Sequence, residues 1–287
     1  MKKRKKTNER LIDMNLFKLI FIILIIPLFS CAKGENNILD EEAGMYNFKK
    51  NESIVYEIND LFHAKKTKEA FYLISSYSHK FNVDEKVGVG AILYSNGYYK
   101  LSKSYFEDAS LAGNPEAFYR LGYFYNYNED EKDVELAIKY FNLSIEAGYL
   151  SSYINLGEIY LFEDDFVSLS TARFNFKKAV SLGFMNGYYG LGEINLREGN
   201  FYEAKNDFEK LKKYGYLLEY YDGCVNLYSK YEDSEFYDID LAKKYIDIII
   251  LLIDDPRKYE IIADFYKGDH KYRDLNKSNY YSELEKY

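Results

Sequence analysis

The sequence repeats itself at a nearly constant interval, which limits the chain to a small group of folds. The segment LGEIYLFEDDF begins at Leu156, LGEINLREGNF begins at Leu191, and a weaker copy, LGYFYNYNEDE, begins at Leu121. Each copy begins 35 residues after the previous one. A fixed period between about 20 and 50 residues is typical of stacked repeat arrays. The chain is therefore expected to consist of one structural unit that recurs along its length.

The end of each unit carries the pattern of an α-helix, the second helix of the unit. Small, aromatic and mostly small residues follow one another at spacings of four and three, which forms one apolar face. The three columns are Ser102, Ala137, Ala172 and Ala204; Phe106, Phe141, Phe176 and Phe208; and Ala109, Ser144, Ala179 and Leu211. The helix is predicted to begin at an N-cap and to end at a left-handed glycine. The N-caps are Asp133, Ser168, Asn200 and Asp238, and the glycines are Gly113, Gly148, Gly183 and Gly215.

The segment after each of these glycines predicts the first helix of the next unit. It contains a column of small residues, the glycine column, preceded in most units by leucine. The column consists of Gly122, Gly157, Gly192 and Cys224. A glycine inside a helix costs about 1 kcal/mol relative to alanine, so its recurrence indicates that two helices approach closely. Each unit is then a helix hairpin that buries its apolar face by stacking on its neighbours. Cys224 is expected to be a buried thiol.

The same pattern extends in both directions. Upstream, GAILYSNGYYKLSKSYF places Ala91 in the glycine column. Downstream, KYEIIADFYKG reads as a first helix with Ala263 in that column, and NKSNYYSELEKY is polar enough for a terminal cap. About six or seven hairpins are expected in a repeat domain of residues 52–287, clearest in 85–215 and closed by a cap at about 256–287.

The unit A-x-x-x-L-G-x-x-Y followed by D-x-x-x-A-x-x-Y-F-x-x-S-x-E-A-G resembles the Sel1-like repeat, a relative of the tetratricopeptide repeat. The match is best between Ala117 and Gly148. The resemblance implies an all-α fold, an α-solenoid of stacked antiparallel helix hairpins wound into a right-handed superhelix. It also implies that the first helices line the concave face.

Residues 1–30 resemble a bacterial lipoprotein signal peptide. MKKRKKTNER is basic, and the uninterrupted apolar run from Leu19 to Ile26 is far shorter than the roughly 20 residues of a membrane-spanning helix. The LFSC that ends at Cys31 resembles a lipobox, which implies lipidation of Cys31 and anchoring to a bacterial membrane, the outer membrane or cell surface rather than the inner membrane. The alternative is an ordinary secretory peptide with an incidental cysteine. Residues 31–51 are polar and are expected to form a flexible tether.

Charge and the absence of catalytic motifs narrow the function. The chain has 38 basic and 46 acidic residues, and residues 1–30 hold seven of the basic and two of the acidic ones, so the remainder carries a net charge of −13. Such a chain repels nucleic acid and favours a basic or neutral protein or peptide partner. The three histidines lie on separate units, and the sequence contains no metal-binding or nucleophile motif. No enzyme activity, metal site or cofactor is expected.

The concave face is the predicted binding surface. Positions counted from the leucine column combine tyrosines with carboxylates, which suits an extended peptide that carries lysine or arginine. The candidate residues are Glu116, Tyr119, Tyr123, Ile154, Glu158, Tyr189 and Glu193. Two alternatives stay open: part of this set could pack against the second helices, and the 33 tyrosines of the chain could reflect codon bias.

Two functions are compatible with these features. The first is a membrane-tethered repeat scaffold that mediates protein–protein interaction in the bacterial cell envelope. The alternative is a lipoprotein that binds a glycan, in peptidoglycan or on a host surface, by stacking the tyrosines of the groove on sugar rings. Carboxylates interleaved with the tyrosines favour the scaffold.

Overall fold

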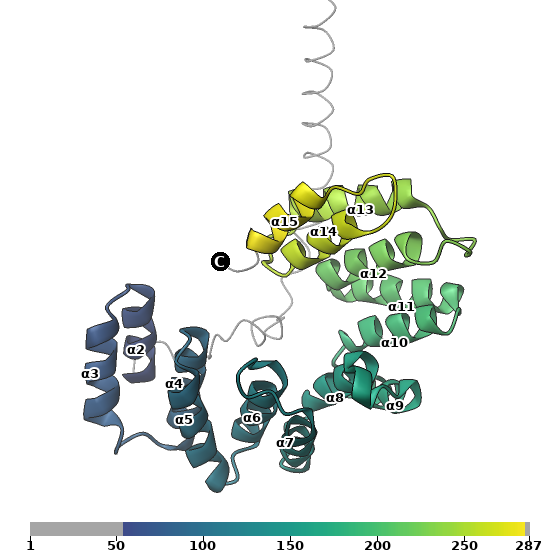
Figure 1. Ribbon diagram of the computed structural model, residues 1–287. Helices are drawn as coiled ribbons and strands as arrows, with labels where there is room; N and C mark the ends of the chain where they lie inside the picture. Colours follow the sequence, from purple (N-terminus) through teal and green to yellow (C-terminus); the bar gives the residue numbers. More distant parts are fainter. Residues whose placement is uncertain (1–53, 285–287) are drawn as a thin grey trace, which may run out of the picture. The chain divides into compact units, whose positions relative to one another are not determined.

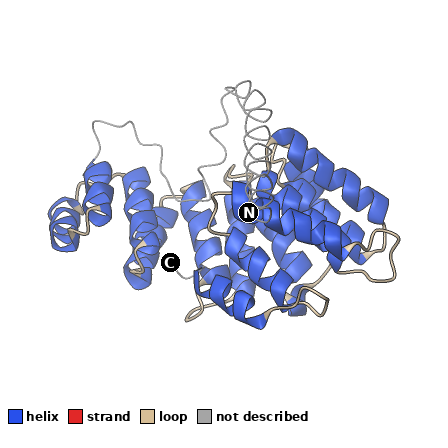
Figure 2. Cartoon of the chain, turned by 90° about the horizontal axis from the view of Figure 1, so that it is seen from above, coloured by secondary structure: helices blue, strands red, loops and turns tan. Residues whose placement is uncertain are grey.

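The computed structural model describes residues 54–284, which belong to a compact unit spanning Ser53–Tyr287. In this range fourteen α-helices and one short 3-10 helix (Asp164–Phe166) are joined by turns, and no strand is present (Figure 2). None of these helices is long and apolar enough to cross a lipid bilayer. The signal peptide expected at 1–30, the lipidated Cys31 and the tether at 31–51 lie outside the described residues.

The helices of the described range pair into seven hairpins that follow one another in chain order (Figure 1). The pairs are α2 (Ile54–His63) with α3 (Thr67–Tyr77), α4 (Val83–Ser95) with α5 (Tyr99–Leu111), α6 (Pro115–Tyr127) with α7 (Val134–Glu146), α8 (Ser152–Phe162) with α9 (Leu169–Ser181), α10 (Gly187–Arg197) with α11 (Phe201–Tyr214), α12 (Leu217–Ser229) with α13 (Ile239–Leu252), and α14 (Lys258–Lys267) with α15 (Leu275–Leu284). The expected all-α solenoid of helix hairpins is confirmed.

The predicted N-cap residues and closing glycines bound the second helices as expected, with one exception. The Asp133 side chain accepts a hydrogen bond from the backbone N–H of Leu136 at 2.9 Å, and Ser168 and Asp238 make the equivalent bond. Asn200 precedes α11 but makes no such bond. The closing glycines all have the positive φ that favours glycine. They are Gly113 (77°), Gly148 (102°), Gly183 (97°) and Gly215 (89°).

The glycine column exists because a phenylalanine ring occupies the space of the missing side chain. Phe176 on α9 is 2% exposed, and its ring packs over Gly157 of α8 and over Gly190 of α10. A Cβ atom would lie 2.7 Å from a ring carbon at Gly157 and 2.2 Å at Gly190, closer than any real contact. One ring therefore joins the two helices of its own hairpin to the first helix of the next. This confirms the close helix approach that the recurring glycine indicates.

These contacts correct the predicted alignment of α12. Gly223 and Gly190 make the same contact, each against the phenylalanine of the preceding second helix, so α12 is offset from α10 by 33 residues. Val225, and not Cys224, then falls in the glycine column. Cys224 instead packs in the cluster around the preceding phenylalanine, and it is buried as expected.

The alignment of α4 also shifts by one residue. A Cβ atom at Gly90 would lie 2.6 Å from the ring of Phe106, so Gly90 and not Ala91 occupies the glycine column. In both units the predicted position was wrong by one because the repeat length varies.

Neighbouring hairpins stack through two kinds of contact. The second helix of one hairpin packs on the first helix of the next, as α9 does on α10 and α11 on α12. The first helices also touch one another, since α10 contacts both α8 and α12, and α12 contacts α14. Side chains from first helices of successive hairpins are thereby brought to one surface, which is called the first-helix face below.

Candidate functional site

All seven predicted groove residues lie on first helices. Ile154 and Glu193 are buried, at 7% and 6% exposure, and the other five remain partly exposed. Glu116 forms an ion pair with Arg120 one turn further along α6, at 3.1 Å. The set is distributed over α6, α8 and α10 and does not surround a single cavity, because only Tyr189 of the seven reaches the pocket described below.

The α6 part of the first-helix face is a cluster of tyrosine rings. The Tyr123 ring centroid lies 5.9 Å from that of Tyr94 on α4, 6.4 Å from Tyr119 and 4.5 Å from Tyr127. The Tyr127 hydroxyl donates a hydrogen bond to Glu158 of α8 at 3.3 Å. Aromatic contacts and one hydrogen bond thus link α4, α6 and α8 along this face.

Two side-chain hydrogen bonds link the α10 part of the face to α12. Each bond joins residues that occupy equivalent positions of the two helices. The Tyr189 hydroxyl donates to the Asp222 carboxylate at 2.6 Å, and the Asn226 amide donates to Glu193 at 2.8 Å. Because the members of each pair lie 33 residues apart, they occupy equivalent positions of successive first helices. The two bonds cross the junction between hairpins side by side.

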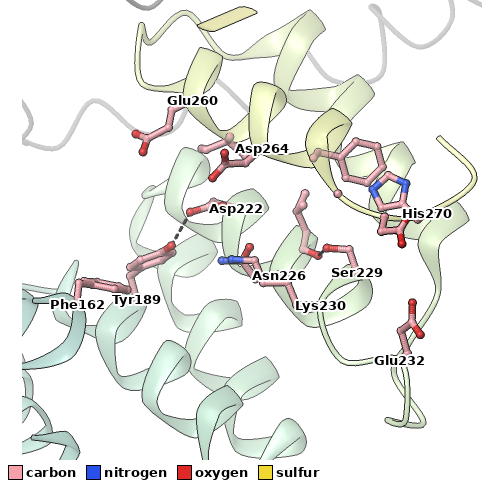
Figure 3. Close-up of a pocket in the computed structure, with 15 residues that line it drawn as sticks. Phe162, Tyr189, Asp222, Asn226, Ser229, Lys230, Glu232, Glu260, Asp264 and His270 are labelled. Atoms are coloured by element: carbon pink, nitrogen blue, oxygen red, sulfur yellow. Dashed lines mark hydrogen bonds between the residues drawn. The ribbon is translucent and has the colours of Figure 1, made fainter. Parts of the chain in front are cut away.

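A pocket of about 720 Å³ opens on the first-helix face where α10, α12 and α14 meet (Figure 3). Its apolar lining consists of Phe162, Val225, Ile261 and Phe265, and its carboxylates are Asp222, Glu232, Glu260, Asp264 and Asp269. Lys230 is the one lysine among the lining residues, and His270 also borders the pocket. This volume is within the range of roughly 300–1,000 Å³ that is usual for ligand pockets.

The polar groups at the wall of the pocket are desolvated. Burial raises the pKa of Asp222 to about 7, and the neighbouring Glu193 carboxylate adds to the rise, while the hydrogen bond from Tyr189 opposes it. Burial likewise raises the pKa of Glu193, against the positive charge of Lys230 and the bond from Asn226. The Asp222 carboxyl therefore holds its proton to a higher pH than an ordinary aspartate does.

Most of this pocket was not predicted from the sequence, because the predicted groove ended at α10 and the predicted alignment of α12 was wrong by one residue. With the corrected alignment, two positions four residues apart recur on five first helices. They read Tyr119 and Tyr123, Ile154 and Glu158, Tyr189 and Glu193, Asp222 and Asn226, and Glu260 and Asp264. The signal for the last pair was present, since Ala263 was placed in the glycine column. Extending the same count from Ala263 finds Glu260 and Asp264.

The arrangement provides a concave site with negative charge and apolar surface. Within residues 54–284, no group of three metal-ligating side chains is close enough to hold a metal ion. Carboxylates beside aliphatic and aromatic side chains suit a ligand that is both cationic and partly apolar.

No protein-family model and no curated protein matches the sequence. Several solved structures are similar to it, among them the following two. A Sel1 repeat protein from Oxalobacter formigenes has a TM-score of 0.51 at 17% identity, over 81% of this chain and 98% of that protein. A protective antigen of uropathogenic Escherichia coli strains that displays an SLR fold has a TM-score of 0.46 at 17% identity, over 74% of this chain; the match spans only 47% of the antigen. Together with the seven stacked hairpins, the first of these similarities shows that the described residues have the fold of Sel1-like repeat proteins.

Proposed function

We propose that the protein is a repeat scaffold of the bacterial cell envelope that binds a protein partner through its first-helix face. The observation that carries the proposal is the pocket shared by α10, α12 and α14. Stacked repeats present extended surfaces built from equivalent positions of successive units, and such surfaces suit polypeptide partners. The proposal involves no catalysis, metal or cofactor.

The side chains of the first-helix face favour a basic or neutral polypeptide over a glycan. Sugar recognition by stacking requires aromatic rings whose faces are open, but the Tyr123 ring lies among the rings of Tyr94, Tyr119 and Tyr127. The pocket beyond it is bordered by carboxylates. Negative charge around an apolar floor complements a polypeptide that carries lysine or arginine.

The envelope location rests on the sequence before the described residues. We place the protein on the outer membrane or cell surface through acyl chains on Cys31, with residues 31–51 as the tether. Lipidation anchors a protein stably when two or more chains act together, without any spanning helix.

The tether proposal predicts a change of fraction for the Cys31→Ser protein. In bacteria that process lipoproteins, the parent protein is expected in the membrane fraction and labelled by an alkyne fatty acid fed to the cells. The Cys31→Ser protein is expected to lose both properties while remaining folded. Unchanged labelling and membrane retention in the variant would rule out Cys31 as the anchor. Cys224→Ser serves as the control, because that thiol is buried in the repeat domain.

The binding proposal predicts that photocrosslinking depends on the helix face. Phe162 on α8 is 47% exposed and borders the pocket, whereas Phe174 on α9 of the same hairpin is 58% exposed and does not. Each is replaced by benzoylphenylalanine in the membrane-bound protein, and the cells are irradiated. A discrete protein adduct is expected from position 162 and little or none from position 174. Equal adducts from both positions would refute the first-helix face as the binding surface, and a glycan adduct at 162 would support the alternative function.

A further inference from the structure

The C-terminal ends of α9, α11 and α13 carry large apolar side chains that remain exposed. They are Leu182, Tyr214 and Leu252, at 44%, 40% and 59% exposure. They occupy one position of the repeat, ten residues after the buried small residues of their helices, which are Ala172, Ala204 and Ala242. Because successive hairpins stack in the same orientation, this position lies along one edge of the array. The ends of these three helices are called the second-helix edge below.

The end of α13 is apolar in several directions at once. Leu251 is 80% exposed and Ile250 is 37% exposed, so three consecutive apolar side chains end this helix. Consecutive residues of a helix point about 100° apart, and a folded protein would cover only one side of such an end. Three side chains also expose much less than the roughly 800 Å² that each partner contributes to a stable protein interface. A fluid hydrocarbon phase can surround all three.

The second-helix edge is basic on an acidic chain. Lys178, Lys212 and Lys213, near the ends of α9 and α11, are exposed. No aspartate or glutamate occurs in residues 166–192 or in residues 210–218, whereas the whole chain has a net charge of −8. Local positive charge of this kind is complementary to an anionic surface.

The carboxylates near the end of α13 are largely neutralised. Arg257 pairs with Asp255 at 2.7 Å and with Glu219, in the first turn of α12, at 3.0 Å. Asp254 is the carboxylate that stays exposed there without an ion pair among the described residues. A lysine in the last turn of a helix also stabilises that helix, but an exposed leucine does not. Exposed aliphatic, aromatic and lysine side chains in one strip are typical of segments that lie in the interface of a lipid bilayer.

We propose that the second-helix edge rests on an anionic lipid bilayer. The ends of α9 and α13 place Leu182, Leu251 and Leu252 between the headgroups and the acyl chains, and Lys212 and Lys213 lie beside lipid phosphates. This inference goes beyond the proposed function, because it concerns a different surface from the first-helix face. It requires that the protein reaches a membrane, but no particular anchor or protein partner.

Local fluorescence tests this contact in the full-length protein. A fluorescent amino acid whose emission depends on polarity replaces Leu182, Leu252 or Tyr202. Tyr202 is 63% exposed in the first turn of α11 and marks the opposite edge. The proteins are mixed with vesicles of equal parts phosphatidylglycerol and phosphatidylcholine with brominated acyl chains, and protein that floats with the vesicles is measured. We expect blue-shifted emission at 182 and 252 and about threefold stronger quenching than at 202, since interfacial side chains reach roughly 5–10 Å into the acyl boundary.

Lysine variants test the preference for anionic lipid. In the protein labelled at position 252, Lys212→Gln with Lys213→Gln is expected to bring the quenching close to the level found with brominated phosphatidylcholine alone, because basic residues near an anionic surface strengthen binding. Lys68→Gln with Lys100→Gln removes the same charge from exposed positions in the first turns of α3 and α5. This control is expected to leave the quenching unchanged.

Four results would overturn the inference. Protein that does not float, or that floats without quenching at 182 and 252, would show that the edge does not bind lipid. Equal quenching at 182, 252 and 202 would mean that no edge is preferred. Quenching that Lys212→Gln with Lys213→Gln leaves unchanged would exclude anionic lipid as the partner. Emission that is already blue-shifted without vesicles would assign the edge to a second copy of the chain. The crosslinking result at Phe162 is independent of these four and tests the proposed function separately.

Discussion

A Phe176→Ala protein is expected to lose about 3–5 kcal/mol of unfolding free energy, the usual cost of removing a buried phenylalanine. The ring is 2% exposed and fills the space above Gly157 and Gly190. Gly157 and Gly190 have no side chains of their own that could fill the gap. The loss therefore includes a cavity shared by three helices, α8, α9 and α10.

Chemical denaturation followed by circular dichroism measures this loss, and hydrogen exchange shows where it acts. In a stacked array each unit is stabilised mainly by its neighbours, so α8 to α10 should lose protection first. Phe174→Ala is the matched control on the same helix, two residues away and 58% exposed. It is expected to change stability by about 0.5 kcal/mol or less. Similar losses in the two variants would contradict the role given to the Phe176 ring.

The repeat itself and its internal packing could be predicted from the sequence because one physical requirement recurs in each unit. The four phenylalanines of the aromatic column, Phe106, Phe141, Phe176 and Phe208, are all at most 2% exposed. The recurring glycine of the first helices indicated a close helix contact, and the structure shows that the recurring phenylalanine makes it. The N-cap residues of the second helices could also be predicted, except at Asn200. Its side-chain amide donates a hydrogen bond to Glu198 instead of capping α11.

The alignment between units was less predictable, because loop lengths vary while helix packing does not. The offset is 35 residues between α8 and α10 but 33 between α10 and α12. A one-residue error turns a helix position by about 100°, which exchanges a buried for an exposed side chain. This is why Asp222 and Asn226 were absent from the predicted groove.

The burial of the groove side chains could not be predicted from the sequence of a single helix. Glu193 was expected to face a partner, but the Asn226 amide covers it and leaves it 6% exposed. Tyr189 was also expected to face a partner, but its hydroxyl donates a hydrogen bond to Asp222 of the next hairpin. Both outcomes depend on how α12 packs on α10. A single sequence does not specify the distance between these two helices.

The second prediction concerns the buried carboxyl group of Asp222. The unfolding free energies of the parent protein and of Asp222→Asn are expected to differ by an amount that depends on pH. The pKa of Asp222 is raised from 3.8 to about 7 by burial and by the nearby Glu193. A carboxyl group with a raised pKa stabilises the fold while it is protonated. Its contribution is fully present below about pH 4 and is lost as the pH rises through about 7, and the loss can reach about 4 kcal/mol.

Asparagine at position 222 removes the titrating carboxyl group and is expected to keep the local structure. Its carbonyl oxygen accepts the same hydrogen bond from Tyr189, and its shape matches that of aspartate. Relative to the parent, the variant is therefore expected to gain stability steadily from about pH 4 to about pH 8. The other charged groups near position 222, which are Glu193 on α10 and Glu219 and Lys230 on and beside α12, are common to both proteins and largely cancel in the difference.

Denaturant unfolding of both proteins across this pH range measures the difference directly. Asp264→Asn is the control, because it removes an exposed carboxylate of the same pocket that stays in contact with water. Its curve should run parallel to that of the parent. A difference between parent and Asp222→Asn that stays constant with pH would mean that water reaches the Asp222 carboxylate. The Tyr189 bond and the packing of α10 on α12 would then leave this wall of the pocket solvated.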